Sequence, residues 1–206
     1  MIEDARYFPH AQYTSMPWRN GAGITREIAR APAQGASFAW RLSLASLQIS
    51  GPFSSYAGYQ RCVALVDGRG FILHVAGADS RQLAERGDYA LFAGAAEARC
   101  ELLDGACTDL SLIVHDPGAI DSVARLEVGG ERSFAVPAGK LQVLFALRGA
   151  IECGATGAFG TTAARALRFE LDIHDTLLLY GRGQPWSVAP TTGGAAELLL
   201  ITFASV

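Results

Sequence analysis

The chain has 206 residues, enough for one large or two small domains. It is 50% hydrophobic and 18% charged, a balance that suits a buried globular core and excludes intrinsic disorder. The formal net charge is −3 and Lys140 is the single lysine, so we expect no basic surface of the nucleic-acid-binding type. No apolar run approaches the roughly 20 residues of a membrane-spanning helix. The acidic N-terminus lacks a secretory signal, so we expect a cytoplasmic protein.

Residues 1–15 predict a first strand that leads into the segment Met16–Ile28, around which the chain is organised. Gly21 and Gly23 mark a sharp bend or a close approach of the backbone to another group. Beyond them the pattern alternates, and it places Thr25 and Glu27 together on one face of a strand. Such a turn followed by a polar strand face is a candidate site, and an ordinary glycine-rich loop is the alternative.

Short strands follow at regular spacing. Residues 40–47 alternate cleanly, with Arg41 and Ser43 on the face opposite Trp40 and Leu42. Residues 61–66 and 71–75 predict a hairpin closed by Asp67–Gly70. Residues 118–125 fit one or two helical turns. The other predicted strands lie near 81–84, 89–92, 98–103, 109–114, 126–128, 132–136, 141–148, 150–153, 167–171, 176–180 and 197–203. Many short strands separated by turns predict an all-β sandwich or barrel.

An internal repeat divides the chain. Residues 87–94 and 174–181 share aspartate, leucine and glycine in register, and each copy follows a hairpin with a glycine at its tip. The simplest interpretation is two related β-units, 1–117 and 118–206, with coincidence in a glycine- and leucine-rich chain as the alternative. Because no proline- or serine-rich linker separates them, we expect the two units to pack as one block.

Four motifs in chain order resemble the HutD/Ves family: Met16–Ile28, Trp40–Ser43, Gly51–Ser54 and Gly58–Arg61. The resemblance implies a two-cupin (bicupin) β-barrel in a single chain and a cytoplasmic location. It also implies an association with histidine degradation, in a small-molecule-binding or regulatory role and without an established catalytic activity.

The chain departs from the family pattern at several positions. Ala22 lies in a run that is usually all glycine, Arg19 stands where lysine is common, and Ala57 replaces a proline. Ser111 stands where the family tends to have asparagine. This last difference matters most, because it removes an amide that can bind a ligand, and it points to an altered ligand or a degraded site.

The residues favour neither a metal centre nor a known cofactor motif. The four histidines, His10, His74, His115 and His174, are spread along the chain, without the convergent spacing of transition-metal ligands. The nucleotide-binding and serine-nucleophile motifs are absent. We therefore expect no metal and no cofactor. The four cysteines, Cys62, Cys100, Cys107 and Cys153, form no Cys-x-x-Cys pair and predict free, buried thiols.

Arginines dominate the candidate ligand site. Arg61 follows a glycine turn and can hold a carboxylate with two parallel hydrogen bonds, or can pair structurally with Glu27 or Asp109. Arg41 points either into the barrel or out from its polar face. The aromatic candidates are either walls of a site or ordinary core residues. The full set of candidates is Trp18, Arg19, Asn20, Thr25, Glu27, Arg41, Ser43, Phe53, Arg61 and Asp109.

Three functional hypotheses follow. The first is a metal-free bicupin that binds a small carboxylate metabolite and regulates or assists histidine degradation; the resemblance implies a ligand such as urocanate or a formylglutamate-like compound. The second is an enzyme acting on an intermediate of the same pathway, with Glu27 as general base. The third is a structural partner protein. We expect neither nucleic acid nor membrane as a partner, and a homodimer stays open.

Overall fold

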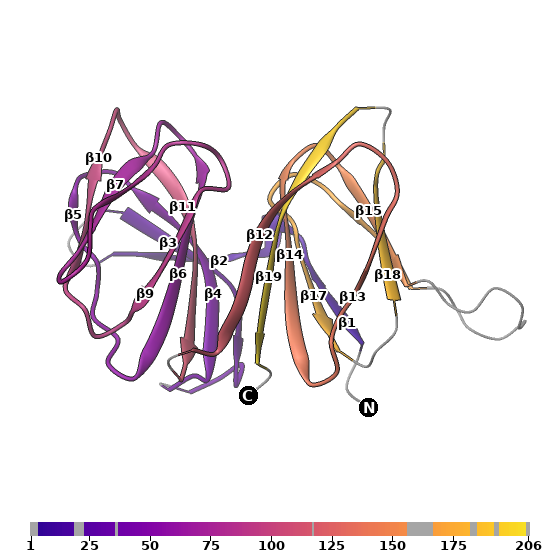
Figure 1. Cartoon of the computed structure of the whole chain (residues 1–206), viewed down its shortest axis with the longest axis horizontal. Coiled ribbons are helices and arrows are strands. Elements are labelled where there is room, and N and C mark those ends of the chain that lie inside the picture. Colours follow the sequence, from indigo (N-terminus) through magenta and orange to yellow (C-terminus); the bar gives the residue numbers. More distant parts are fainter. Residues whose placement is uncertain are drawn as a thin grey trace, which may run out of the picture. The chain divides into compact units, whose positions relative to one another are not determined.

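The computed structural model describes residues 4–18, 23–35, 37–116, 118–155, 167–181, 185–191 and 194–204. These residues form nineteen strands and one short 3-10 helix, His10–Gln12, which confirms the all-β prediction. None of them belongs to a helix long and apolar enough to cross a membrane. The chain divides into two compact units, Tyr13–Ile120 and the combination of Met1–Gln12 with Asp121–Ser205. We call them the N-terminal and the C-terminal unit (Figure 1).

The N-terminal unit contains two antiparallel sheets. The larger sheet has the order β2 (Thr14–Pro17), β3 (Gly23–Ala31), β4 (Trp40–Leu47), β11 (Cys107–His115), β6 (Tyr59–Asp67) and β9 (Tyr89–Ala93). The smaller sheet has the order β5 (Gly51–Pro52), β10 (Ala98–Leu102), β7 (Phe71–Val75) and β8 (Arg81–Leu83). The predicted hairpin over 61–75 is wrong, because β6 and β7 belong to different sheets and do not pair with each other. Only its turn is present, where Gly68 and Gly70 take the positive φ values that glycine tolerates.

The C-terminal unit also contains two sheets. The larger has the order β1 (Ala5–Phe8), β17 (Thr176–Tyr180), β14 (Lys140–Arg148), β19 (Ala196–Ala204) and β12 (Ile120–Val128). The smaller has the order β13 (Arg132–Ala135), β18 (Pro185–Pro190), β15 (Ile151–Ala155) and β16 (Arg168–Leu171). Because β1 pairs with β17, the first strand belongs to this unit and not to the N-terminal half of the sequence.

A predicted helical segment is also wrong. Residues 118–125, interpreted as helical turns, contribute instead to strand β12, which lies beside β19. Ile120 and Val123 are buried and three positions apart, a spacing that fits a helix as well as a twisted strand. Both side chains are β-branched, which favours the extended conformation once a neighbouring strand is available.

The internal repeat is confirmed as a repeat of the fold. The strand order β9-β6-β11-β4 in the N-terminal unit corresponds to β17-β14-β19-β12 in the C-terminal unit, and β8-β7-β10-β5 corresponds to β16-β15-β18-β13. Gly87 and His174 occupy equivalent positions and both have positive φ, 85° and 72°. The next residue, Asp88 or Asp175, accepts backbone N–H bonds from the preceding turn in each copy. The two aspartates therefore cap equivalent turns, one in each unit.

The inner face of the N-terminal unit changes character across the larger sheet. On β9, the smaller sheet and β6 beyond Arg61 it is apolar, with a buried cluster that includes Val63, Leu65 and Phe71. On β3, β4 and β11 it carries polar side chains. At Gly23 the backbone approaches closely, as the sequence predicted: an added Cβ would lie 2.3 Å from the Ser46 carbonyl oxygen. Gly21 lies outside the described residues.

Candidate functional site

A cavity of about 540 Å³ lies against the polar part of this inner face, a volume typical of small-molecule sites. Strand register explains its lining. Residues directly opposite on antiparallel strands share a face, so Arg41, Ile113 and Arg61 form one row across β4, β11 and β6. Ser43 and Ser111 form the next row, and Ala45 and Asp109 the one after it. The lining residues are Met16, Pro17, Trp18, Thr25, Arg41, Ser43, Ala45, Pro52, Phe53, Ser54, Tyr56, Arg61, Asp109, Ser111 and Ile113.

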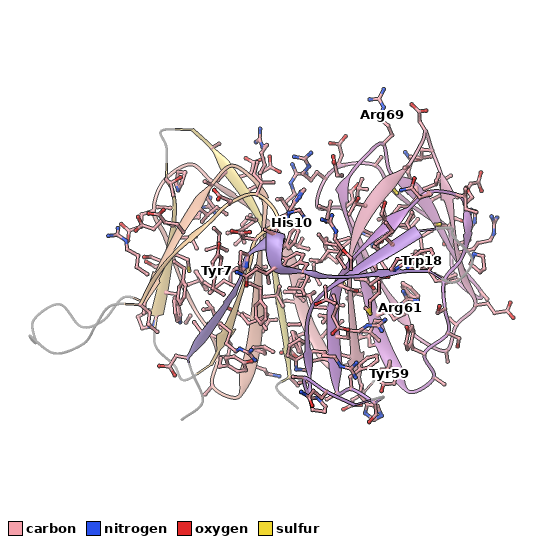
Figure 2. The ribbon with its side chains drawn as sticks, turned by 180° about the vertical axis from the view of Figure 1, so that it is seen from behind. Tyr7, His10, Trp18, Tyr59, Arg61 and Arg69 are labelled. Atoms are coloured by element: carbon pink, nitrogen blue, oxygen red, sulfur yellow. The ribbon has the colours of Figure 1, made fainter. Side chains whose placement is uncertain are left out.

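Arg61 is the most buried cation of this lining, with 4% of its surface exposed (Figure 2). Its Nη1 donates to the carbonyl oxygen of Ser54 at 2.9 Å. The guanidinium lies 5.0 Å from the ring centre of Phe53 and 5.1 Å from that of Phe92, within cation–π distance. Its Nε has no hydrogen-bond partner among the described residues. Burial lowers the pKa of Arg61, yet an arginine in a protein stays charged at neutral pH.

Arg41 supplies a second guanidinium. Its Nη2 donates to the hydroxyl of Tyr56 at 2.8 Å, and the group lies over the rings of Phe38 and Tyr56. Its Nε also lacks a partner in the described part of the chain. The Tyr56 ring lies 5.6 Å from the Arg61 guanidinium as well, so one aromatic side chain contacts both cations. Two like charges held this close repel one another, and a bound anion would relieve that repulsion.

Asp109 is the acidic group of the cavity. Its side chain is 0% exposed, and neither carboxylate oxygen has a hydrogen-bond partner within the described ranges. Burial raises the pKa of Asp109 to about 7, against the opposing effect of Arg61. Arg61 and Asp109 form no direct ion pair within 4.0 Å, although both belong to the lining. The carboxyl group is therefore ready to accept or to donate a hydrogen bond near neutral pH.

Neutral polar groups complete the lining. Ser43 and Ser111 face one another across the β4–β11 pair and are 2% and 6% exposed. Trp18 donates from Nε1 to the Thr25 hydroxyl at 2.7 Å, which fixes the indole as one wall. The cavity thus combines cationic, hydroxyl and carboxyl groups with aromatic walls, an arrangement suited to binding and orienting a small polar molecule.

The structure brings most of the predicted site residues together. Seven of them line the cavity: Trp18, Thr25, Arg41, Ser43, Phe53, Arg61 and Asp109. Arg41 faces the interior of the unit, which resolves its open orientation. Glu27 lies opposite Ser43 in register but does not belong to the lining. Arg19 and Asn20 lie outside the described residues. Whether any of these side chains binds a ligand stays a prediction.

Sequence reasoning missed two residues of consequence. Tyr56, which touches both guanidiniums, lies in a segment interpreted only as a turn between Gly51 and Gly58. An aromatic side chain inside a polar loop was the available signal. Ser111 is the second; the family pattern marks it as a departure from asparagine, but it is not among the predicted site residues. Its position two residues after Asp109 on a strand already places both side chains on one face.

The cysteines and histidines contribute little to the site. All four cysteines are free and buried, as predicted. Burial raises the pKa of the Cys62, Cys107 and Cys153 thiols to about 12, which keeps them protonated and unreactive. Among the described residues, no three His, Cys, Asp or Glu side chains gather as metal ligands would. Metal independence stays a prediction.

Comparison with known proteins gives two informative sequence relatives. A 21.2 kDa protein from the hutC 3' region of Pseudomonas putida is 45% identical over 102 residues, which cover 49% of this chain and 53% of that protein. The chain thus spans about half the length of that relative. The protein Ves of Citrobacter koseri is 31% identical over 138 residues, covering 66% of this chain and 70% of Ves.

Solved structures extend the similarity over the whole chain. A conserved protein of unknown function from Pseudomonas aeruginosa PAO1 is 34% identical with a TM-score of 0.84, covering 98% of this chain and all of the other. HutD from Pseudomonas fluorescens SBW25 is 29% identical with a TM-score of 0.74 and the same coverage. Oxalate decarboxylase from Lactobacillus farciminis, 11% identical with a TM-score of 0.67, shares the fold alone and covers 100% of this chain and 87% of its own.

These neighbours confirm the predicted bicupin fold. The HutD family model matches residues 10–199, a range that takes in most of both β-units and every described residue of the cavity lining. The chain belongs to the HutD family.

Proposed function

We propose that the N-terminal unit binds a small carboxylate-bearing metabolite in its cavity, and that the protein regulates or assists histidine degradation. One observation carries the proposal. Two guanidiniums, Arg41 and Arg61, share the cavity and a single aromatic neighbour, Tyr56, and each keeps an Nε without a partner among the described residues.

The physical argument is one of charge and geometry. A guanidinium matches a carboxylate with two parallel N–H···O bonds, which an ammonium group cannot do. Aromatic rings around Arg61 exclude water, so its attraction for an anion is stronger than at an exposed surface. An anion between the two arginines also removes their mutual repulsion.

The choice of metabolite rests on the family. HutD from Pseudomonas fluorescens and the protein from the Pseudomonas putida hutC region carry the names of histidine-utilisation genes. Urocanate and formylglutamate-like compounds of that pathway bear carboxylates and are small enough for such a cavity.

The enzymatic alternative with Glu27 as general base has weaker support. A general base must come within hydrogen-bond reach of the proton that it removes. Glu27 lies opposite Ser43 in register but not in the lining. We therefore assign binding, and not turnover, to the cavity.

Thermal melting with urocanate and with N-formylglutamate tests the proposal. A ligand at about a hundred times its dissociation constant stabilises the folded state by about 2.7 kcal/mol. For a chain of this length that raises the melting temperature by roughly 5–10 °C if unfolding is close to two-state. Arg61→Lys should remove most of the shift, because lysine keeps the charge and loses the bidentate geometry.

Arg69→Lys is the matched control. Arg69 lies in the turn between β6 and β7, is exposed, pairs with Asp104 at 3.6 Å and does not belong to the cavity lining. Figure 2 shows it at the edge of the unit, apart from Arg61. This variant should keep the full ligand response. A melting temperature that neither compound raises in the wild-type protein would contradict the proposed binding.

A further inference from the structure

The Asp109 carboxyl group forms no ion pair within 4.0 Å and no hydrogen bond of normal geometry within the described chain, and when ionised it would repel a carboxylate ligand. Each carboxylate oxygen has the capacity for about two hydrogen bonds. Here both oxygens are fully buried and neither has a partner among the described residues. A buried acceptor without a partner costs free energy, so its retention within a cavity lining calls for an external donor.

The rows of the sheet place Asp109 away from the arginines. Arg41 and Arg61 lie in the row of Ile113, and Asp109 lies four residues earlier on β11. At about 3.4 Å per residue, the two rows are roughly 13 Å apart along the strand at their backbones. The row of Ser43 and Ser111 lies between them. The long Arg61 side chain still brings its guanidinium close enough to act electrostatically on the Asp109 carboxyl, but the two groups form no ion pair within 4.0 Å. The lining thus offers cationic, hydroxyl and carboxyl groups from three successive rows.

We propose that this cavity selects a bipolar ligand, which presents a carboxylate to Arg41 and Arg61 and an N–H donor to Asp109. The inference rests on the proposed function and adds to it the second half of the recognition. The donor is an imidazole, amide or amine N–H separated from the carboxylate by a few bonds. The serine hydroxyls of the middle row hydrogen-bond polar atoms between the two ends.

Two matched pairs of probes test the donor requirement. The first is urocanate against 3-(2-furyl)acrylate, which keeps the carboxylate, the double bond and a five-membered ring but has no N–H. The second is N-formylglutamate against its ester analogue, in which oxygen replaces the N–H. Calorimetric titration at pH 8 keeps Asp109 largely ionised, because its pKa is about 7.

We expect the donor-bearing member of at least one pair to bind the wild-type protein about tenfold more tightly or better, the value of one hydrogen bond to a charged group. Asp109→Leu, which replaces the carboxyl group by an apolar side chain, should abolish this preference while leaving the donor-free probe bound. Asp109→Asn is the second variant, for use if the leucine variant folds poorly. It retains a hydrogen-bond acceptor at nearly the same volume, so it should keep a reduced preference for the donor-bearing probe. Asp104→Asn, at an exposed carboxylate, is the control.

The outcomes separate this inference from the proposed function. If both members of each pair bind equally well and their binding depends on Arg61, the carboxylate site stands and the bipolar inference is wrong. Tighter binding of the furan or ester probe would mean that Asp109 acts as a protonated donor, which also overturns the inference. If none of the four probes binds, both proposals fall.

Discussion

The two units repeat one strand order around different interiors. When the turns at Gly68 and Gly149 are aligned, β6 corresponds to β14, and the strand register then makes β11 correspond to β19. Arg61 of the N-terminal unit corresponds to Gln142, Asp109 to Leu198 and Ser111 to Leu200. Each of these three polar groups of the cavity has a neutral or apolar counterpart.

The C-terminal interior is filled with side chains. Trp186 is fully buried and packs in a cluster with Leu144, Leu177 and Leu198. Gln142, the counterpart of Arg61, donates from its amide nitrogen to the Thr202 hydroxyl at 3.0 Å, while its Oε1 and the Trp186 Nε1 have no partner among the described residues. In the N-terminal unit the buried atoms without a partner in the described chain belong to charged side chains, Arg41, Arg61 and Asp109 among them. Both copies of the fold have a buried apolar cluster, and the N-terminal copy also places charged side chains around a cavity.

The largest expected effect comes from emptying the packed interior. Trp186→Ala should lower the free energy of unfolding by about 3–5 kcal/mol, because it removes buried area and leaves a cavity. Trp18→Ala, at a half-buried wall of the existing cavity, should cost clearly less. Urea unfolding of both variants measures the difference. Equal losses would show that the two interiors do not differ in packing as described.

A pH-dependent effect should distinguish Asp109 from its counterpart Leu198. The folded-state pKa of Asp109, about 7, lies above its value in the unfolded chain, so the folded protein binds more protons between about pH 4 and 7. Stability therefore falls as pH rises through this window, by roughly 2–3 kcal/mol between pH 5 and 8 from this group.

Asp109→Asn removes that contribution. Without ligand, its stability relative to the wild-type protein should rise between pH 5 and pH 8 by the same amount. Chemical unfolding of both proteins at the two pH values isolates the contribution, because all other titrating groups are shared. A difference that stays constant with pH would place the pKa of Asp109 near its ordinary value.

The smallest effect expected concerns two tyrosines with different tasks. Tyr56→Phe removes the hydroxyl that accepts from Arg41 and keeps the ring between the two guanidiniums, so ligand affinity should fall about tenfold. Tyr7→Phe removes a donor to Asp175, where burial and this hydrogen bond raise the pKa of the phenol. It should weaken the attachment of β1 to β17 by about 1 kcal/mol and leave binding unchanged. Titration and melting of both variants check this division. A binding defect in Tyr7→Phe would contradict it.

The sequence by itself determined the periodic features of this protein. Alternation over 40–47 was sufficient to place Arg41 and Ser43 on one face, because a strand repeats every two residues. The turn at Asp67–Gly70 followed from glycine's tolerance of positive φ. The repeated Asp88 and Asp175 predicted two related units, since each caps the same turn.

Tertiary structure decided everything that depends on which strands meet. Residues 118–125 form part of a strand because β19 offers a partner, which local spacing does not reveal. The partner of Arg61 is a backbone carbonyl seven residues away, and not one of the two carboxylates that its charge suggested. Asp109 lacks a partner among the described residues because register and burial together hold it out of contact with both arginines. Register and burial follow from packing between distant segments, and no local pattern encodes them.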